Sequence, residues 1–195
     1  MADEVGSAWR ALILLAAFAG LRFGELAALR KTRVDLVHGT VAVVEAISDL
    51  RGGVRHVGPP KSEAGRRTVA IPPHMLGELN AHLDEFSEPA PDGLVFVGPK
   101  GGPLRSSTFS RSVWRPARDR VGLSHVHFHD IRGCAATLAA ISGATTAELM
   151  ARLGHTTPDM AMRYQRATAD RDAALAKALS AHVEAVILPL RRTTA

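Results

Sequence analysis

The chain has 195 residues, of which 46% are hydrophobic and 22% charged, and its 24 lysines and arginines outnumber its 19 aspartates and glutamates. This hydrophobic share is sufficient for a folded core and argues against an intrinsically disordered chain. The net charge of +5 permits binding to a polyanion but does not by itself demonstrate it. The single cysteine, Cys134, excludes an internal disulfide and favours a reducing compartment.

The apolar segment 11–20 could be mistaken for a secretory signal, because residues 17–19 read Ala-Phe-Ala and so imitate a cleavage site. Asp3 and Glu4 stand where such a signal carries positive charge. The segment is also too short to cross a bilayer. We therefore expect a soluble protein of the cytoplasm.

The N-terminal region is predicted to be helical. A buried helix is expected over residues 7–19 with Ser7 as its N-cap, and Gly20 should end it before a second short helix over 22–30.

A β region follows. Two apolar runs within residues 34–47 flank a His-Gly pair, which predicts a hairpin. A second hairpin is expected from residues 54–60 and 66–72, with residues 61–65 (Lys-Ser-Glu-Ala-Gly) at its turn. Two prolines end the first of these strands and should place it at a sheet edge, because proline cannot donate to a ladder.

The remainder of the chain is predicted to be helical with short connections. Thr145 and Glu148 have the spacing of a capping box, and Pro116 should break the helical segment that contains it. The expected elements are helices over 72–86, 104–123, 129–143, 145–154, 157–165 and 167–188, a loop over 88–93 and a buried extended piece over 94–98. Together these elements indicate an α+β fold that is mainly α with a small antiparallel β-sheet.

Tyr164 is the only tyrosine of the chain and follows His155 by nine positions. With an ordinary pKa of about 10, a tyrosine is a poor nucleophile at neutral pH. It becomes effective when cations stabilise its phenolate and arginines hold a phosphate as its target. Cationic partners are therefore expected elsewhere in the chain.

Such cations occur in four local contexts: the entry to a short helix, the turn of the second expected hairpin, the start of the helix over 129–143, and the loop after the helix over 145–154. Glu25 lies three residues after Arg22, the first of these cations, on the same helical face. In chain order, the cations and the tyrosine are Arg22, Lys61, His129, Arg132, His155 and Tyr164.

Four motifs carry these residues: AGLRFGELAALR, PPKSEAGRRTVAIP, HDIRGCAATLAAISG and LGHTTPDMAMRYQ. Their order and local contexts resemble the catalytic domain of the tyrosine recombinases, the phage integrase family, over residues 8–168. Each motif alone is weak, but six matching residues in order are a strong signal. Gly133 departs from the family pattern, in which the residue after the second arginine is often histidine.

The resemblance implies the integrase catalytic-domain fold and a site-specific DNA recombinase of the phage or prophage type. Tyr164 would cleave and rejoin DNA through a 3′-phosphotyrosine intermediate, without metal, ATP or any other cofactor. The two arginines would hold the phosphate oxygens, and Lys61 would protonate the leaving oxygen. The two histidines would bond the phosphate or move the phenol proton, and Glu25 would orient Arg22.

The resemblance also implies a domain organisation and partners. Residues 1–168 would form the catalytic domain, and residues 169–195 a C-terminal helical tail that packs on its own domain or on a neighbouring protomer. The separate N-terminal DNA-binding domain of the family has no room here, so we expect part of a longer integrase. Expected partners are double-stranded DNA, further integrase protomers in a tetramer on two DNA sites, and DNA-bending accessory proteins, in the cytoplasm of a bacterial host at its nucleoid and without a membrane.

Other interpretations stay open. The chain could be a type IB topoisomerase-like strand transferase or a catalytically inactive DNA-binding fragment. His125, His127 and His129 would share one face of an extended strand and could ligate zinc, but no second ligand pair has suitable spacing, so no metal is expected. Further arginines could contact DNA phosphates or equally form a solvated face: Arg66, Arg67, Arg105, Arg111, Arg115 and Arg118.

Overall fold

The computed structural model describes residues 1–50, 54–162, 164, 176–177 and 180. Its contacts divide the chain into two units, Met1–Tyr164 and Gln165–Ala195. The helix predicted over residues 167–188 falls almost entirely outside the described residues. Among the described residues, no helix is long and apolar enough to cross a membrane.

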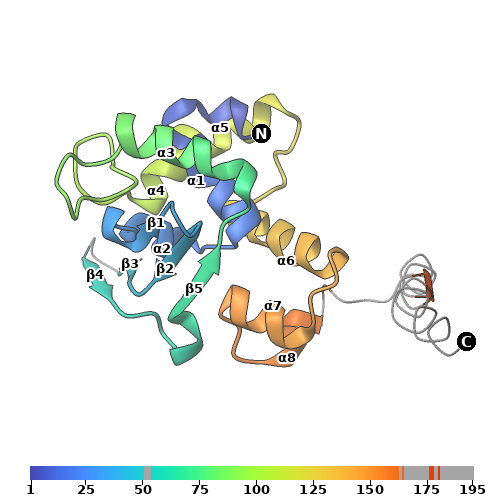
Figure 1. Ribbon diagram of the computed structural model, residues 1–195. Coiled ribbons are helices and arrows are strands. Elements are labelled where there is room, and N and C mark those ends of the chain that lie inside the picture. The colour runs from blue at the N-terminus through green and yellow to red at the C-terminus, as the bar shows by residue number, and fades with distance from the viewer. Residues whose placement is uncertain (51–53, 163, 165–175, 178–179, 181–195) are drawn as a thin grey trace, which may run out of the picture. The chain divides into compact units, whose positions relative to one another are not determined.

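Within Met1–Tyr164, helices pack around two small antiparallel sheets, so the predicted α+β class is confirmed (Figure 1). The helices are α1 (Ser7–Leu14), α2 (Phe23–Ala28), α3 (Leu76–Glu85), α4 (Ser106–Phe109), α5 (Arg115–Arg120), α6 (Ile131–Ile141), α7 (Thr146–Leu153) and α8 (Pro158–Met162). The strands are β1 (Val34–Asp35), β2 (Thr40–Val43), β3 (Ala46–Asp49), β4 (Arg55–Gly58) and β5 (Arg67–Ala70).

The first predicted helix is confirmed and is continued by a π-helical turn, Leu15–Ala19. Its predicted cap is wrong, because Gly6 occupies the N-cap position and Ser7 already lies inside α1. Gly20 ends the segment with φ of 69°, as predicted. A methyl group on Gly20 would lie 2.6 Å from Cδ2 of Leu153, so glycine also permits α7 to approach this turn closely.

The β region differs from the prediction in its pairing. The hairpin of β1 and β2 is confirmed, and β5 joins β2 to complete an antiparallel sheet in the order β1-β2-β5. The second predicted hairpin is wrong, because β4 pairs with β3 rather than with β5. Residues 61–65 therefore connect two different sheets. The prediction failed because alternating hydrophobicity identifies a strand but not its partner.

The predicted break at Pro116 is also absent. A π-helical turn, Ser110–Trp114, links α4 to α5, and Pro116 lies within the first two positions of α5. Because α4, this turn and α5 form one continuous helical segment, Pro116 removes one intrahelical N–H donor without ending the helix.

Helices α6, α7 and α8 follow one another at one side of the unit (Figure 1). The predicted capping box of α7 is confirmed, because the Thr145 side chain accepts from the backbone N–H of Glu148 and the Glu148 carboxylate accepts from that of Thr145. Helix α6 packs on the π-helical turn Leu15–Ala19, and α7 packs on β5. Elements distant in sequence therefore meet around the C-terminal end of α7.

Candidate active site

Arg22 is oriented by the first turn of α2, whose N-cap it is. Its backbone N–H donates to Oε2 of Glu25, and its Nη1 donates to Oε1 of the same carboxylate, both at 2.8 Å. The Arg22 side chain is 37% exposed, so the guanidinium remains accessible to a ligand.

Glu25 is buried and also accepts hydrogen bonds from Arg67 on β5. Nη1 and Nη2 of Arg67 donate to the two carboxylate oxygens at 3.0 and 2.9 Å, a bidentate pair. Burial alone would raise the pKa of Glu25, but the hydrogen bonds and charge of Arg67, with the bonds from Arg22, hold it below its usual value. The carboxylate is therefore ionised at neutral pH and holds two arginines in place.

Arg132, in the first turn of α6, is buried in contact with two backbone carbonyls. Its Nη1 donates to the carbonyl oxygen of Gly20, and its Nη2 donates to that of Leu153. Burial and the positive charge of Arg22 lower the pKa of Arg132 to about 9, so it stays protonated at neutral pH. A guanidinium has five N–H donors, which leaves three for an anion.

Three consecutive carbonyls at the C-terminal end of α7 each accept from a different arginine. Arg67 Nε donates to Arg152 O at 2.8 Å, Arg132 to Leu153 O, and Arg22 Nη2 to Gly154 O at 3.0 Å. Carbonyls at a helix C-terminus lack intrahelical donors and carry partial negative charge, so cations stabilise them. These three arginines, the arginine clamp, connect α2, β5 and α6 to the C-terminal end of α7.

Gly154 ends α7 in the left-handed conformation with φ of 61°. His155 follows immediately and is buried, and its Nδ1 has no hydrogen-bond partner among the described residues. Burial, followed by the charges of Arg132 and Arg22, lowers the pKa of His155 to about 4. The imidazole is therefore neutral at pH 7 and can donate one hydrogen bond.

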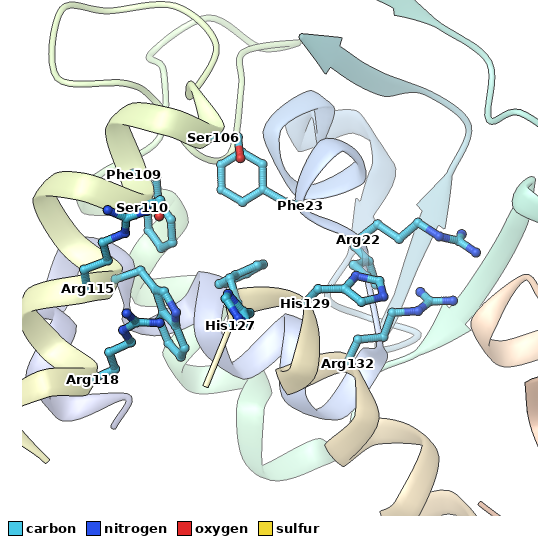
Figure 2. A pocket seen from close by; sticks show the side chains of 13 residues that line it. Arg22, Phe23, Ser106, Phe109, Ser110, Arg115, Arg118, His127, His129 and Arg132 are labelled. Carbon is cyan, nitrogen blue, oxygen red and sulfur yellow. The ribbon is translucent and has the colours of Figure 1, made fainter. Parts of the chain in front are cut away.

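Five of the six predicted side chains line two adjoining cavities. Arg22, His129 and Arg132 line one cavity of about 220 Å³, and Figure 2 shows the three side chains extending to the same side. His129 and Arg132 also line a second cavity of about 350 Å³ together with His155 and Tyr164. Because the cavities share two residues, all five side chains border one positively charged region.

Tyr164 is half-buried and lies over the start of α6. A methyl group on Gly133 would lie 3.9 Å from both Cε1 and the hydroxyl oxygen of Tyr164. The ring packs on small and aliphatic side chains that include Ala135 and Leu153. A methyl group at position 133 would therefore be in ordinary van der Waals contact with the phenol, without a clash.

Lys61 is exposed and lies outside these two cavities. It lines a third cavity of about 280 Å³ together with Arg22 and Glu25. Arg22 borders both this cavity and the first one, so the lysine-bearing segment adjoins the site through that arginine.

The additional predicted arginines divide into two kinds. The side chain of Arg67 is only 5% exposed and is bonded to Glu25, whereas the side chains of the other members have no such buried partner among the described residues and are themselves part of exposed or half-buried residues. Sequence reasoning missed this difference. The alternation of β5 could have revealed it, because residue 67 shares the inward face with the buried Val69 and Ile71.

The histidine run does not form the extended strand considered for zinc. Residues 128–130 form a 3-10 turn, with the backbone N–H of His127 donating to Asp130. Within the described part of the chain, no three histidine, cysteine or acidic side chains are grouped so as to hold a metal ion.

A family model described as the phage integrase family matches residues 3–171. The integrase of prophage phiRv2 from Mycobacterium tuberculosis is 40% identical over 174 residues, which cover 88% of this chain and 46% of the relative. The integrase of Mycobacterium phage L5 is 37% identical over 185 residues, covering 92% and 49%. The chain thus spans about half the length of the curated relatives it matches.

Solved structures show the same fold. The Tn1549 transposon integrase in complex with transposon right-end DNA matches with a TM-score of 0.75 at 19% identity, covering 91% of this chain and 60% of that one. The XerA recombinase matches with a TM-score of 0.67 at 22% identity, covering 93% and 61%. At such identities the likeness establishes the fold alone.

Proposed function

The chain belongs to the phage integrase family, and from that premise we propose that it cleaves and rejoins DNA as the catalytic part of a site-specific tyrosine recombinase. The observation that carries the proposal is the cavity lined jointly by His129, Arg132, His155 and Tyr164. It combines a phenol with a buried guanidinium and two imidazoles in a space of about 350 Å³.

The proposed reaction is a phosphoryl transfer to tyrosine. The hydroxyl oxygen of Tyr164 attacks a backbone phosphorus, the bond from phosphorus to the 5′ oxygen breaks, and a 3′-phosphotyrosyl bond forms. Lys61 donates a proton to the leaving 5′ oxygen, and the phenol proton passes to a histidine or to solvent. A 5′-hydroxyl of the partner strand later attacks the phosphotyrosine and releases the phenol, so the bond energy is conserved.

Two arginines would stabilise the charge that develops on the phosphate. Arg22 and Arg132 each retain three of their five donors after their bonds within the protein. Their guanidiniums are held in place before DNA binds, which is the requirement for electrostatic stabilisation of a transition state. His155, neutral at pH 7, would donate a hydrogen bond to a non-bridging oxygen, and His129 would bond the phosphate from the exposed side.

The proposed substrate is double-stranded DNA, and further integrase protomers are proposed partners. The integrases that resemble this chain are phage and prophage proteins, so the proposed place of action is the chromosome of a bacterial host, in the cytoplasm. Three exposed arginines, Arg66, Arg105 and Arg111, are proposed to contact phosphates other than the scissile one.

The test is covalent trapping on a nicked duplex that carries the element's attachment core. The nick lies just 3′ to the scissile phosphate, so the short 5′-hydroxyl fragment dissociates and cleavage cannot reverse. We expect an adduct that survives denaturation, that is absent with Tyr164→Phe, and that still forms in EDTA.

Each alternative has its own outcome. DNA binding without an adduct, at saturating protein and with the cognate core, would make the chain a binding fragment. Efficient relaxation of supercoiled DNA that lacks the core would favour a topoisomerase-like activity. An adduct that disappears in EDTA would instead require a metal ion.

A further inference from the structure

We propose that Arg67 is a positioning residue of this site: it fixes Arg22 and His155 relative to each other and does not itself contact DNA. The inference rests on the proposed function, because it concerns the same reaction centre. It replaces the expectation that Arg67 binds a DNA phosphate.

The guanidinium of Arg67 has most of its donors occupied within the protein. Nη1 and Nη2 donate to the carboxylate of Glu25 at 3.0 and 2.9 Å, Nη1 also donates to Gly65 O at 3.0 Å, and Nε donates to Arg152 O at 2.8 Å. These bonds use four of its five N–H groups. With a side chain that is 5% exposed, it has little capacity for an external anion.

The acceptors of Arg67 belong to separate elements that meet at the site. Glu25 lies in α2 and holds Arg22 by two hydrogen bonds of 2.8 Å. Arg152 O lies in the last turn of α7, three residues before His155. Gly65 O lies in the connection that precedes β5. A single planar guanidinium thus sets the distance between the element that carries an arginine and the element that carries a histidine.

The planar shape of the guanidinium is required as well as its charge. A lysine at position 67 would keep one positive charge on one nitrogen, which cannot span the Glu25 carboxylate and the Arg152 carbonyl in the same fork geometry. Arg67→Lys therefore changes the geometry of the connection while it conserves the charge of the site.

The adjacent residue provides a contrast. Arg66 is exposed and precedes β5, whereas Arg67 points inward with the buried Val69. If Arg66 contacts a phosphate and Arg67 positions the site, their substitutions should affect different measured quantities: DNA affinity for Arg66 and the rate of the bound complex for Arg67.

The experiment measures two quantities on the nicked duplex: the rate constant of adduct formation at saturating protein, and the Kd for DNA over a range of salt. For Arg67→Lys we expect the rate constant to fall on the order of 100-fold, the loss produced by a misplacement of about 1 Å, with the Kd and its salt dependence unchanged. For Arg66→Gln we expect weaker binding and a salt slope smaller by about 1.

A double-mutant cycle separates positioning from general destabilisation. Because Arg67 acts partly through Glu25, Arg67→Lys combined with Glu25→Gln should reduce the rate by less than the product of the two separate reductions. Arg120→Lys is the matched control, since Arg120 makes an exposed ion pair with Glu4. It should keep the wild-type rate and affinity.

Three results would overturn the inference: a wild-type rate constant for Arg67→Lys, a loss confined to DNA affinity, or failure of Arg67→Lys to unfold cooperatively as a native protein does. A wild-type rate constant would show that Arg67 does not position the site. A loss confined to DNA affinity would show that it contacts a phosphate, and loss of cooperative unfolding would show that it is needed only for folding. If the wild-type chain itself forms no adduct, the proposed function fails and this inference fails with it.

Discussion

The two sides of the candidate site are constructed differently. The anchored side consists of Arg22, Arg132 and His155, which are held by backbone carbonyls, by a buried carboxylate and by burial itself. The reacting side consists of Lys61, which is exposed, and Tyr164, which is half-buried. Neither the Lys61 ammonium nor the Tyr164 hydroxyl is hydrogen-bonded to the residues that the structure describes.

This difference in how firmly the side chains are held fits the proposed role of each side in the reaction. Groups that stabilise charge on a phosphate act best when they are fixed before the substrate arrives, because no reorganisation is then needed during the reaction. A general acid and a nucleophile must instead approach atoms whose positions change as bonds form and break. We therefore predict that substitutions on the anchored side alter both stability and rate, whereas loss of the Lys61 ammonium or the Tyr164 hydroxyl alters the rate alone.

The largest effect is expected from Arg132→Ala on the anchored side. Loss of this guanidinium removes a phosphate ligand, so the rate of adduct formation should fall by about 10³-fold. It also leaves the carbonyls of Gly20 and Leu153 without their arginine donor, which should lower the free energy of unfolding by about 1–3 kcal/mol. Single-turnover cleavage and urea denaturation measure the two losses, and an unchanged stability would contradict the anchoring.

Lys61→Ala tests the reacting side. We expect adduct formation to slow by about 100-fold through loss of a general acid, while the free energy of unfolding changes by less than about 0.5 kcal/mol, as for an exposed side chain. A substrate with a 5′-bridging sulfur, whose leaving group needs no proton, should restore the rate. If that substrate restores nothing, Lys61 does not protonate the leaving oxygen.

Gly154→Ala should weaken the anchored side through the backbone. The left-handed conformation at φ of 61° costs an alanine about 1 kcal/mol. In addition, its Cβ would lie 2.7 Å from Ala64 O and 3.2 Å from Nη1 of Arg67, which should bring the total loss to about 2 kcal/mol or more. Gly101→Ala is the control, because Gly101 has φ of 77° with no atom within 4 Å of its Cβ position.

A change in the pH dependence of stability is expected at His155. The folded pKa of about 4 lies below the ordinary 6.5, so the unfolded chain binds a proton over this range that the folded chain does not. The stabilisation is therefore complete above pH 6.5 and is lost as the pH falls toward 4, by up to about 1.4 kcal/mol per pH unit. Urea denaturation of His155→Gln should show a shallower slope over that range, and an identical slope would contradict a neutral buried imidazole.

Several elements of the fold were predictable because their signals are local. The capping box of Thr145 and Glu148 and the left-handed Gly20 depend on residues within one helical turn. The second hairpin was not predictable in this way, because β4 and β5 each had a choice of partners and the chosen ones lie elsewhere in the sequence. Local patterns identify the elements, and only the packed chain selects which of them pair.

The sequence by itself determined the chemical groups of the site, their order and the helices that carry most of them, since these follow from residue type, spacing and capping. Tertiary structure alone decided which arginines line the cavities and which hold other side chains in place. Arg66 and Arg67 are chemically identical and adjacent, but only Arg67 finds the Glu25 carboxylate and the Arg152 carbonyl on its side of the strand. A buried guanidinium is stable only where acceptors replace water, and those acceptors come from elements that the chain brings together on folding.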